Sequence, residues 1–174
     1  MKPSPCDLPP GALLHRYKSS GAYTDCYTVE VPRRVSHAEY VEAFYTTFVF
    51  KTERVLLSWL VSKPSTDAQA GRLARGELGS FAAWTVEARA AQQLLMADYV
   101  GRTKSWLMIA QSGDAATRLY FGSAVVPVRD QCGQPRMGRS YSTLLGFHKL
   151  YSRVLLRAAA AKITTASRSA ASEL

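Results

Sequence analysis

The sequence predicts an α+β domain whose antiparallel sheet is covered by helices, and three observations predict it. A segment rich in β-branched and aromatic residues, 23–31, is followed by apolar residues at helical spacing. Between residues 81 and 127, apolar and polar side chains alternate, and glycine-first turns separate the runs. Residues 141–163 then carry an apolar stripe typical of a helix that packs on a sheet.

Length and composition favour one soluble domain. The chain has 174 residues, 47% of them apolar and 20% charged. No run reaches the roughly 18 apolar residues of a membrane span, and the proline-rich N-terminus lacks the apolar core of a secretory signal. We therefore expect a cytoplasmic protein with a flexible arm at 1–20, a single domain at 21–165 and a frayed tail at 166–174.

A strand and two short helices are expected first. The strand 23–31 ends at Pro32, and Ser36 and Glu39 then form the pattern of a capping box, which begins a helix. That helix carries apolar side chains at helical spacing, namely Val41, Phe44, Tyr45 and Phe48. A second short helix is expected from Thr52, with an apolar face of Val55, Leu56, Trp59 and Leu60. Residues 64–79, which contain three glycines, are predicted to be a loop.

Four strands are predicted next: Phe81–Ala90, Gln93–Tyr99, Lys104–Gln111 and Thr117–Val126. Two-residue hairpin loops are expected at Gly101-Arg102 and Gly113-Asp114, with a weaker turn at Ala91-Gln92. These loops would pair Asp98 with Ser105 and Trp106 with Phe121.

This register divides the side chains between two faces of the sheet. The covered face would collect Ala82, Trp84, Val86, Ala88, Leu95, Ala97, Tyr99, Trp106, Met108, Leu119 and Phe121. The solvated face would receive Thr85, Glu87, Arg89, Asp98, Ser105, Arg118 and Tyr120, together with the apolar residues Met96, Leu107 and Ile109.

The last predicted element is the longest helix, from Tyr141 to about Ile163. Its apolar stripe consists of Leu144, Phe147, His148, Tyr151, Leu155 and Ala159, while Lys149, Arg153 and Arg157 follow one another on the wet side.

The predicted order of strand, two short helices, meander and long helix is the helix-grip arrangement, in which a curved sheet wraps around the last helix. Four segments, GAYTDCYTVEVP, GRTKSWLMI, TRLYFGSAVVP and GFHKLYSRVLLRAAA, resemble an uncharacterised bacterial family of the START-like (SRPBCC) superfamily. The resemblance spans Gly21 to Ile163. It implies a cavity between the sheet and the last helix, and it transfers no catalytic residue. The superfamily usually has six strands between its short helices and its long helix, whereas four are predicted here.

The predicted cavity has an apolar lining and a few polar groups. The expected apolar residues are Trp84, Tyr99, Trp106, Met108, Phe121, Phe147, Tyr151 and Leu155. Asp98, Ser105, Lys104 and Arg118 are the polar candidates; Lys104 either extends to water or pairs with an acidic ligand group at the cavity mouth. His148, on the apolar stripe, is either a core histidine with one hydrogen bond or an acid or base in the cavity.

The net charge of +9, with a pI near 9.7, favours anionic partners. The densest basic region comprises Arg129, Arg136, Arg139, Lys149, Arg153 and Arg157. It lacks interleaved aromatics, so no specific nucleic-acid binding is expected, although weak contact with an anionic surface remains open.

Cysteines and histidines predict no metal or cofactor site. Cys6, Cys26 and Cys132 lie far apart in the sequence, which is typical of free thiols, and the three histidines lack ligand spacing.

Three functions follow as expectations. The first is binding of a small apolar or amphipathic molecule in the cavity, by a monomer or a homodimer. The second is a non-catalytic interaction or dimerisation module that uses exposed Met96, Leu107 and Ile109. The third is a cyclase- or isomerase-like enzyme with His148 as acid or base, assisted by Asp98 or Tyr151.

Overall fold

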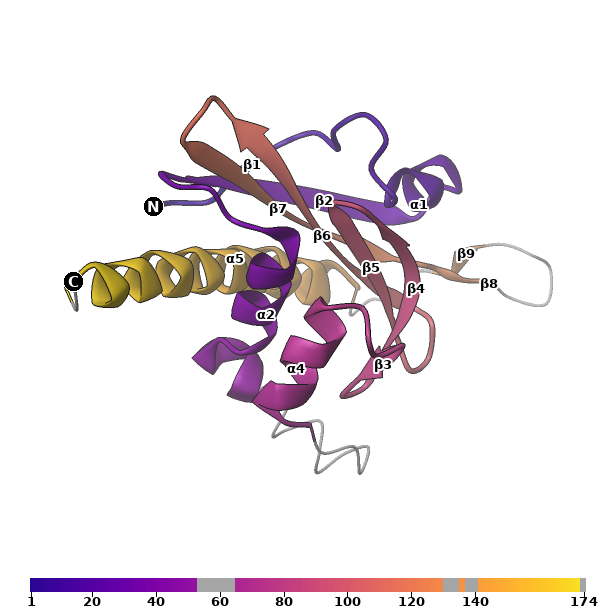
Figure 1. The fold of residues 1–174 in the computed structure, drawn as a ribbon. Coiled ribbons are helices and arrows are strands. Elements are labelled where there is room, and N and C mark those ends of the chain that lie inside the picture. The colour runs from indigo at the N-terminus through magenta and orange to yellow at the C-terminus, as the bar shows by residue number, and fades with distance from the viewer. Residues whose placement is uncertain (53–64, 130–134, 137–140, 173–174) are drawn as a thin grey trace.

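The computed structural model describes residues 1–52, 65–129, 135–136 and 141–172, with the backbone alone at 128–129, 135–136, 141–148 and 167–172. It is an α+β fold (Figure 1). In chain order the elements are β1 (Ser4–Pro5), α1 (His15–Ser19), β2 (Tyr23–Val31), α2 (His37–Tyr45), α4 (Asp67–Ala74), β3 (Ser80–Phe81), β4 (Trp84–Ala90), β5 (Gln93–Asp98), β6 (Thr103–Ser112), β7 (Ala116–Val125), β8 (Val128–Arg129), β9 (Pro135–Arg136) and α5 (Tyr141–Ser172).

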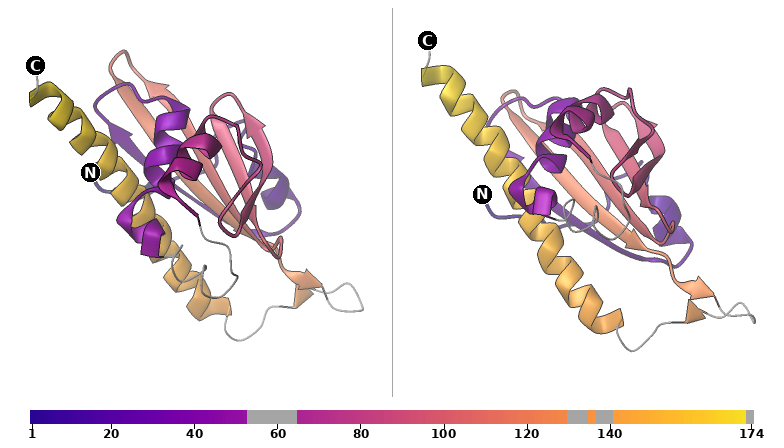
Figure 2. Two further views of the ribbon diagram at one scale, coloured as in Figure 1. Left: turned by 60° about the horizontal axis from the view of Figure 1, so that its bottom comes forward. Right: turned by 90° about the horizontal axis from the view of Figure 1, so that it is seen from below.

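Seven strands form one antiparallel sheet in the order β1-β2-β7-β6-β5-β4-β3, and β8 pairs with β9 outside it. The first long strand, β2, has the predicted bounds and pairs with the last long strand, β7. This pairing places strands from the beginning and from the later part of the chain side by side. The helices α2, α4 and α5 all lie on one face of the sheet, which we call the inner face (Figure 2).

The inner face carries the larger apolar core. Leu94, Met96, Leu107, Ile109 and Phe121 of the sheet belong to one buried cluster with residues of α2, α4 and α5. The prediction that Met96, Leu107 and Ile109 are exposed is therefore wrong: Met96 and Leu107 are fully buried and Ile109 is 2% exposed.

The error in the faces comes from the length of the β6–β7 turn, whereas the longer β5–β6 turn moves the pairing by two residues and leaves each side chain on its face. The β5–β6 turn has four residues, because Asp98 accepts hydrogen bonds from the Gly101 and Arg102 amides at 2.9 and 2.7 Å. The β6–β7 turn has three residues, Gly113 to Ala115. Ser105 is consequently opposite Met96 and not Asp98, while Trp106 is opposite Gly122 and not Phe121. A shift of one residue moves a whole strand face to the other side of the sheet.

Residues 1–20 cover the opposite, outer face of the sheet. Ala12 and Leu14 are buried in a second apolar cluster with Cys26, Leu95 and Trp106. The arm was expected to be loosely tied, and the outer face to be solvated. Both expectations fail at Leu14, whose side chain has no exposed area.

The predicted loop at 64–79 contains a helix, α4. Thr66 and Gln69 form a reciprocal capping box that begins it, so the three glycines at 71, 76 and 79, which predict a loop, do not prevent the helix. Gly71 is buried in α4, and Gly76, with a φ of +82°, follows the end of the helix. Half of the predicted loop, Asp67–Ala74, is thus helical. The expected second short helix falls largely on residues 53–64, outside the described residues.

Two other boundaries differ. The predicted strand Phe81–Ala90 is two strands, β3 and β4, separated by a turn at Ala82, whose φ is +52°. The helix α5 continues to Ser172, beyond the predicted end at about Ile163. Ser36 does accept the Glu39 amide as predicted, at 3.1 Å, but the Glu39 carboxylate pairs with Arg33.

Candidate functional site

A pocket of about 260 Å³ lies between the inner face and α5. Three helical segments (α2, residues 48–52 and α5), the β3–β4 turn, the end of β5 and strands β6 and β7 contribute to it. Its lining consists of Phe44, Phe50, Ala83, Trp84, Asp98, Tyr99, Thr103, Lys104, Ser105, Phe121, Ser123, Tyr151, Ser152 and Leu155.

The apolar part of the pocket is built on aromatic rings. The Phe44 and Phe121 ring centroids are 5.0 Å apart, which joins α2 to the middle of β7. Tyr151 and Leu155, one helical turn apart, contribute the α5 side. Trp84 lies at the start of β4, and its buried Nε1 makes no hydrogen bond within the part of the chain that the structure describes.

The polar part of the pocket is a group of serine hydroxyls. Ser105 and Ser123 are direct neighbours across β6 and β7, and both are buried. The Ser123 hydroxyl donates to Asp25 Oδ1 of β2 at 2.5 Å. Ser152 on α5 is fully buried. The Ser105 hydroxyl makes no hydrogen bond to any described residue, so it is available to a bound molecule.

Asp98 and Tyr99 lie along this pocket where β5 ends. Asp98 holds the β5–β6 turn through its hydrogen bonds to two turn amides, and it is opposite Trp84 on β4. Tyr99 is 61% exposed. The Asp98–Ser105 neighbour pair expected from the sequence does not form, although both residues contribute to the lining.

Lys104 contributes to the lining, but its ammonium group is used on the outer face. Its Nζ donates to Glu87 Oε2 at 2.7 Å and lies 5.1 Å from the centre of the Tyr17 ring. Burial by itself lowers the pKa of Lys104, but hydrogen bonds to Glu87 and Tyr17 outweigh it and raise the pKa above its usual value. Lys104 therefore stays charged, and it fastens α1 to the sheet; its expected pairing with a ligand or with water is replaced by these contacts.

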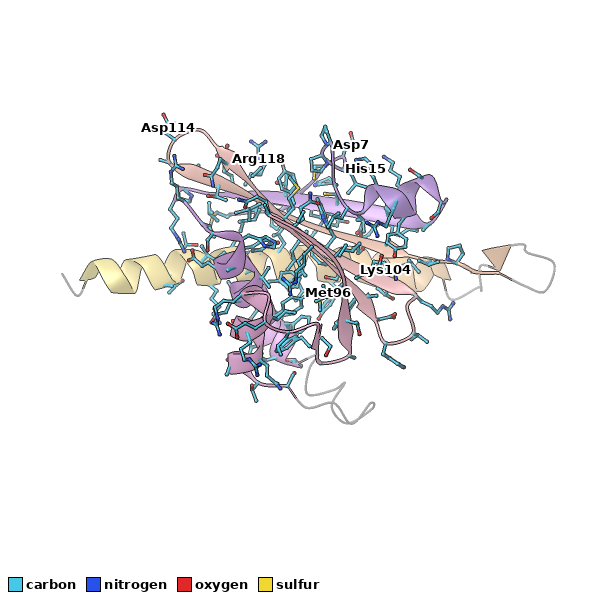
Figure 3. The ribbon with its side chains drawn as sticks, turned by 45° about the vertical axis from the view of Figure 1, so that its right-hand side comes forward. Asp7, His15, Met96, Lys104, Asp114 and Arg118 are labelled. Atoms are coloured by element: carbon cyan, nitrogen blue, oxygen red, sulfur yellow. The ribbon has the colours of Figure 1, made fainter. Side chains whose placement is uncertain are left out.

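Three other predicted residues lie on the outer face. Trp106 is fully buried there, and its Nε1 donates to Gln93 Oε1 at 2.9 Å. Met108 packs against the same outer cluster. Arg118 pairs with Glu30 on β2 at 3.2 Å, on the side of the sheet opposite the one that Met96 faces (Figure 3). None of the three lines the pocket. Trp106 and Met108 lie on the outer face because the three-residue β6–β7 turn shifts the pairing with β7 by one residue.

The side chains of Phe147 and His148 lie outside the described residues, as do those of Arg129, Arg136 and Arg139. Two other members of the basic region, Lys149 and Arg153, contact aromatic rings of β2. Lys149 Nζ is 5.8 Å from the Tyr23 ring centre, and the Arg153 guanidinium is 5.2 Å from that of Tyr27. The sequence predicts that this side of α5 faces water, but these contacts hold it against β2.

Sequence reasoning missed six lining residues, Phe44, Phe50, Ala83, Thr103, Ser123 and Ser152. A signal for Ser123 is present in the sequence: it follows Phe121 by two residues on the same strand, so alternation places both side chains on one face. Phe44 was expected only as core, since a helical apolar stripe does not distinguish core from pocket lining.

Among the described residues, no three His, Cys, Asp or Glu side chains gather as metal ligands would. Within the same part of the chain, no helix combines the length and apolar character needed to cross a bilayer. Comparison with known protein families, with curated proteins and with solved structures gave no match.

Proposed function

We propose that the pocket between the inner face and α5 binds a small, mostly apolar molecule that carries one polar group. The observation that carries this proposal is an aromatic lining beside the buried Ser105, whose hydroxyl, unlike that of Ser123, makes no hydrogen bond to the described residues. Such pockets are mainly apolar, with a few polar groups that orient the ligand.

The pocket volume limits the size of the molecule. At about 30 Å³ per water molecule, 260 Å³ corresponds to roughly nine waters. That is somewhat less than the roughly 300–1,000 Å³ of pockets for drug-sized ligands. A single aromatic ring or a short chain fits this volume, whereas a long acyl chain does not. We therefore narrow the expected amphipathic ligand to a compact one.

The architecture supports the same proposal. A seven-stranded antiparallel sheet whose first long strand pairs with its last, with a long C-terminal helix across one face, agrees with a helix-grip fold. We include membership of the START-like superfamily in the proposal, because ligand cavities between sheet and helix are typical of that arrangement. A catalytic role for His148 stays a prediction. The alternative of an interaction module was based on the exposure of Met96, Leu107 and Ile109. It is no longer supported, because all three residues are buried.

Native mass spectrometry of the freshly purified protein tests the proposal. We expect a discrete additional mass that is lost on denaturation, and titration with indole, a single compact ring system with one N–H, should shift NMR signals of pocket residues. Ser105→Leu should abolish both results because it fills the pocket and removes the hydroxyl. Thr28→Leu, on the outer face of β2, is the matched control and should change neither. Equal indole binding by wild type and Ser105→Leu would refute the proposal.

A further inference from the structure

Two cysteines that are 20 residues apart in sequence meet at the edge of the sheet. The Cys6 and Cys26 Sγ atoms are 3.2 Å apart, and the Cys6 amide donates to the Cys26 carbonyl at 3.0 Å. Pro5 is opposite Tyr27, so the β1–β2 register continues with Cys6 opposite Cys26. Directly opposed Cα atoms in antiparallel strands are about 4.5–5.5 Å apart, which lies inside the roughly 4.4–6.8 Å that a disulfide spans. No backbone movement is needed to join them.

We propose that Cys6 and Cys26 form a reversible disulfide that locks the N-terminal arm onto the outer face of the sheet. β1 has only two residues, so few backbone hydrogen bonds hold this edge. The two cysteines contact the same outer cluster as Ala12 and Leu14. A disulfide at this point closes a chain loop that contains α1. It therefore restricts the conformations that the arm can adopt when it is detached from the sheet.

The surroundings of the two thiols assign them different roles. Cys6 is half-buried, whereas Cys26 is 5% exposed. The hydrogen bond with Cys26 lowers the pKa of Cys6, and the same hydrogen bond, together with burial, raises the pKa of Cys26. Cys6 is thus the accessible nucleophile, and Cys26 is the thiol that resolves the intermediate.

The exchange needs a low-molecular-weight disulfide as the oxidant. The Cys6 thiolate attacks one sulfur of that disulfide, which forms a mixed disulfide and releases one thiolate. The Cys26 sulfur, on losing its proton to solvent, then attacks Cys6 Sγ. The Cys6–Cys26 bond forms, the mixed disulfide breaks and the second thiolate leaves. Two protein thiols are oxidised to one disulfide, and the oxidant is reduced to two thiols.

The test uses the full-length chain with Cys132→Ser, so that only the proposed pair remains, and oxidised glutathione as the probe. We expect the intact mass to fall by two hydrogens with no glutathione attached, and peptide mapping to find Cys6 joined to Cys26. Thermal unfolding should shift upward by roughly 5 °C, and dithiothreitol should reverse the shift. Hydrogen exchange at the Leu13 and Leu14 amides should slow in the oxidised form.

The matched control is Cys6→Ser in the same background, which removes the half-buried thiol and leaves the buried one. It should show neither the mass change nor the upward shift. A stable glutathione adduct on Cys6 without closure, a disulfide between two chains, or no reaction would each overturn the proposal. So would an intramolecular disulfide that leaves exchange at Leu13 and Leu14 unchanged, because the arm would then not be locked.

Discussion

The two faces of the sheet are both covered, but in different ways. The inner face packs against helices and leaves a pocket of about 260 Å³ between β5–β7 and α5. The outer face is covered by an irregular arm, which polar contacts fix in place: Gln93 accepts the Leu13 amide and the Trp106 indole at 2.9 Å each. Helices of fixed shape span a curved sheet imperfectly, whereas an irregular segment can follow it closely. In this protein, the irregular arm therefore makes a closer contact with the sheet than the helices do.

The largest expected effect is a difference in stability between a variant that truncates a buried side chain under the arm and a variant that enlarges a side chain in the pocket. Leu14→Ala should lower the free energy of unfolding by about 2–5 kcal/mol, because Leu14 is fully buried under the arm. Ser105→Val, in the pocket of the inner face, should leave the free energy unchanged or raise it by up to about 2 kcal/mol. Urea unfolding of both variants measures this contrast. If Leu14→Ala costs less than Ser105→Val, the arm is not a packed layer.

A second substitution tests how closely the arm fits the sheet. A Cβ on Gly122 would lie 2.9 Å from Trp106 Cε3 and 3.0 Å from Leu14 Cδ2. Gly122→Ala should therefore cost about 1–3 kcal/mol through overpacking. Gly79→Ala is the matched control, since a Cβ there meets no atom within 4 Å. Thermal unfolding of the two variants should differ; equal midpoints would show that the arm moves aside freely.

The inner face also predicts a pH dependence, through His37 of α2. Burial lowers the pKa of His37 below its ordinary value near 6.5, and its buried Nε2 makes no hydrogen bond within the described residues. The unfolded chain therefore binds a proton more readily than the folded one, and stability falls as the pH drops below about 6.5. Below the folded pKa this loss stops growing. The slope is at most about 1.4 kcal/mol per pH unit.

His37→Gln isolates this contribution from that of other groups. We expect the wild type to lose more stability than His37→Gln between pH 7.5 and pH 5.5, as measured by urea midpoints. Parallel pH profiles for the two proteins would contradict the assignment. Because the arm of the outer face has no part in it, Leu14→Ala should keep the wild-type pH slope.

The smallest expected effect concerns the turn beside the pocket. Ala82, between β3 and β4, has a φ of +52°, a conformation that strains residues other than glycine. Ala82→Gly should therefore stabilise the protein by about 0.5–1 kcal/mol, less any entropy that glycine gains in the unfolded chain. Calorimetry can resolve the resulting small rise in the unfolding temperature. A lowered unfolding temperature would show that the strain at Ala82 is negligible.

How much of the candidate site could be predicted depends on which residues fix a turn. Trp84 and Phe121 were placed on the covered face and lie along the pocket, and Tyr151 and Leu155 follow from the helical stripe of α5. Trp106 and Met108 lie on the outer face instead, because the three-residue β6–β7 turn shifts the pairing with β7 by one residue. The length of a turn is a local feature, but nothing in the alternation of apolar residues reveals it.

The longer elements of this protein can be predicted from local sequence signals. Alternation, helical spacing and the Ser36 cap were enough to place β2, α2, the meander and α5, because these signals act within one segment. Only the tertiary structure decided which face of the sheet is which, what the first 20 residues do, and that Cys6 meets Cys26. These features depend on contacts between residues distant in sequence, such as the 80 residues that separate Leu13 from Gln93. Local patterns carry no record of such partners, so only the folded chain can bring them together.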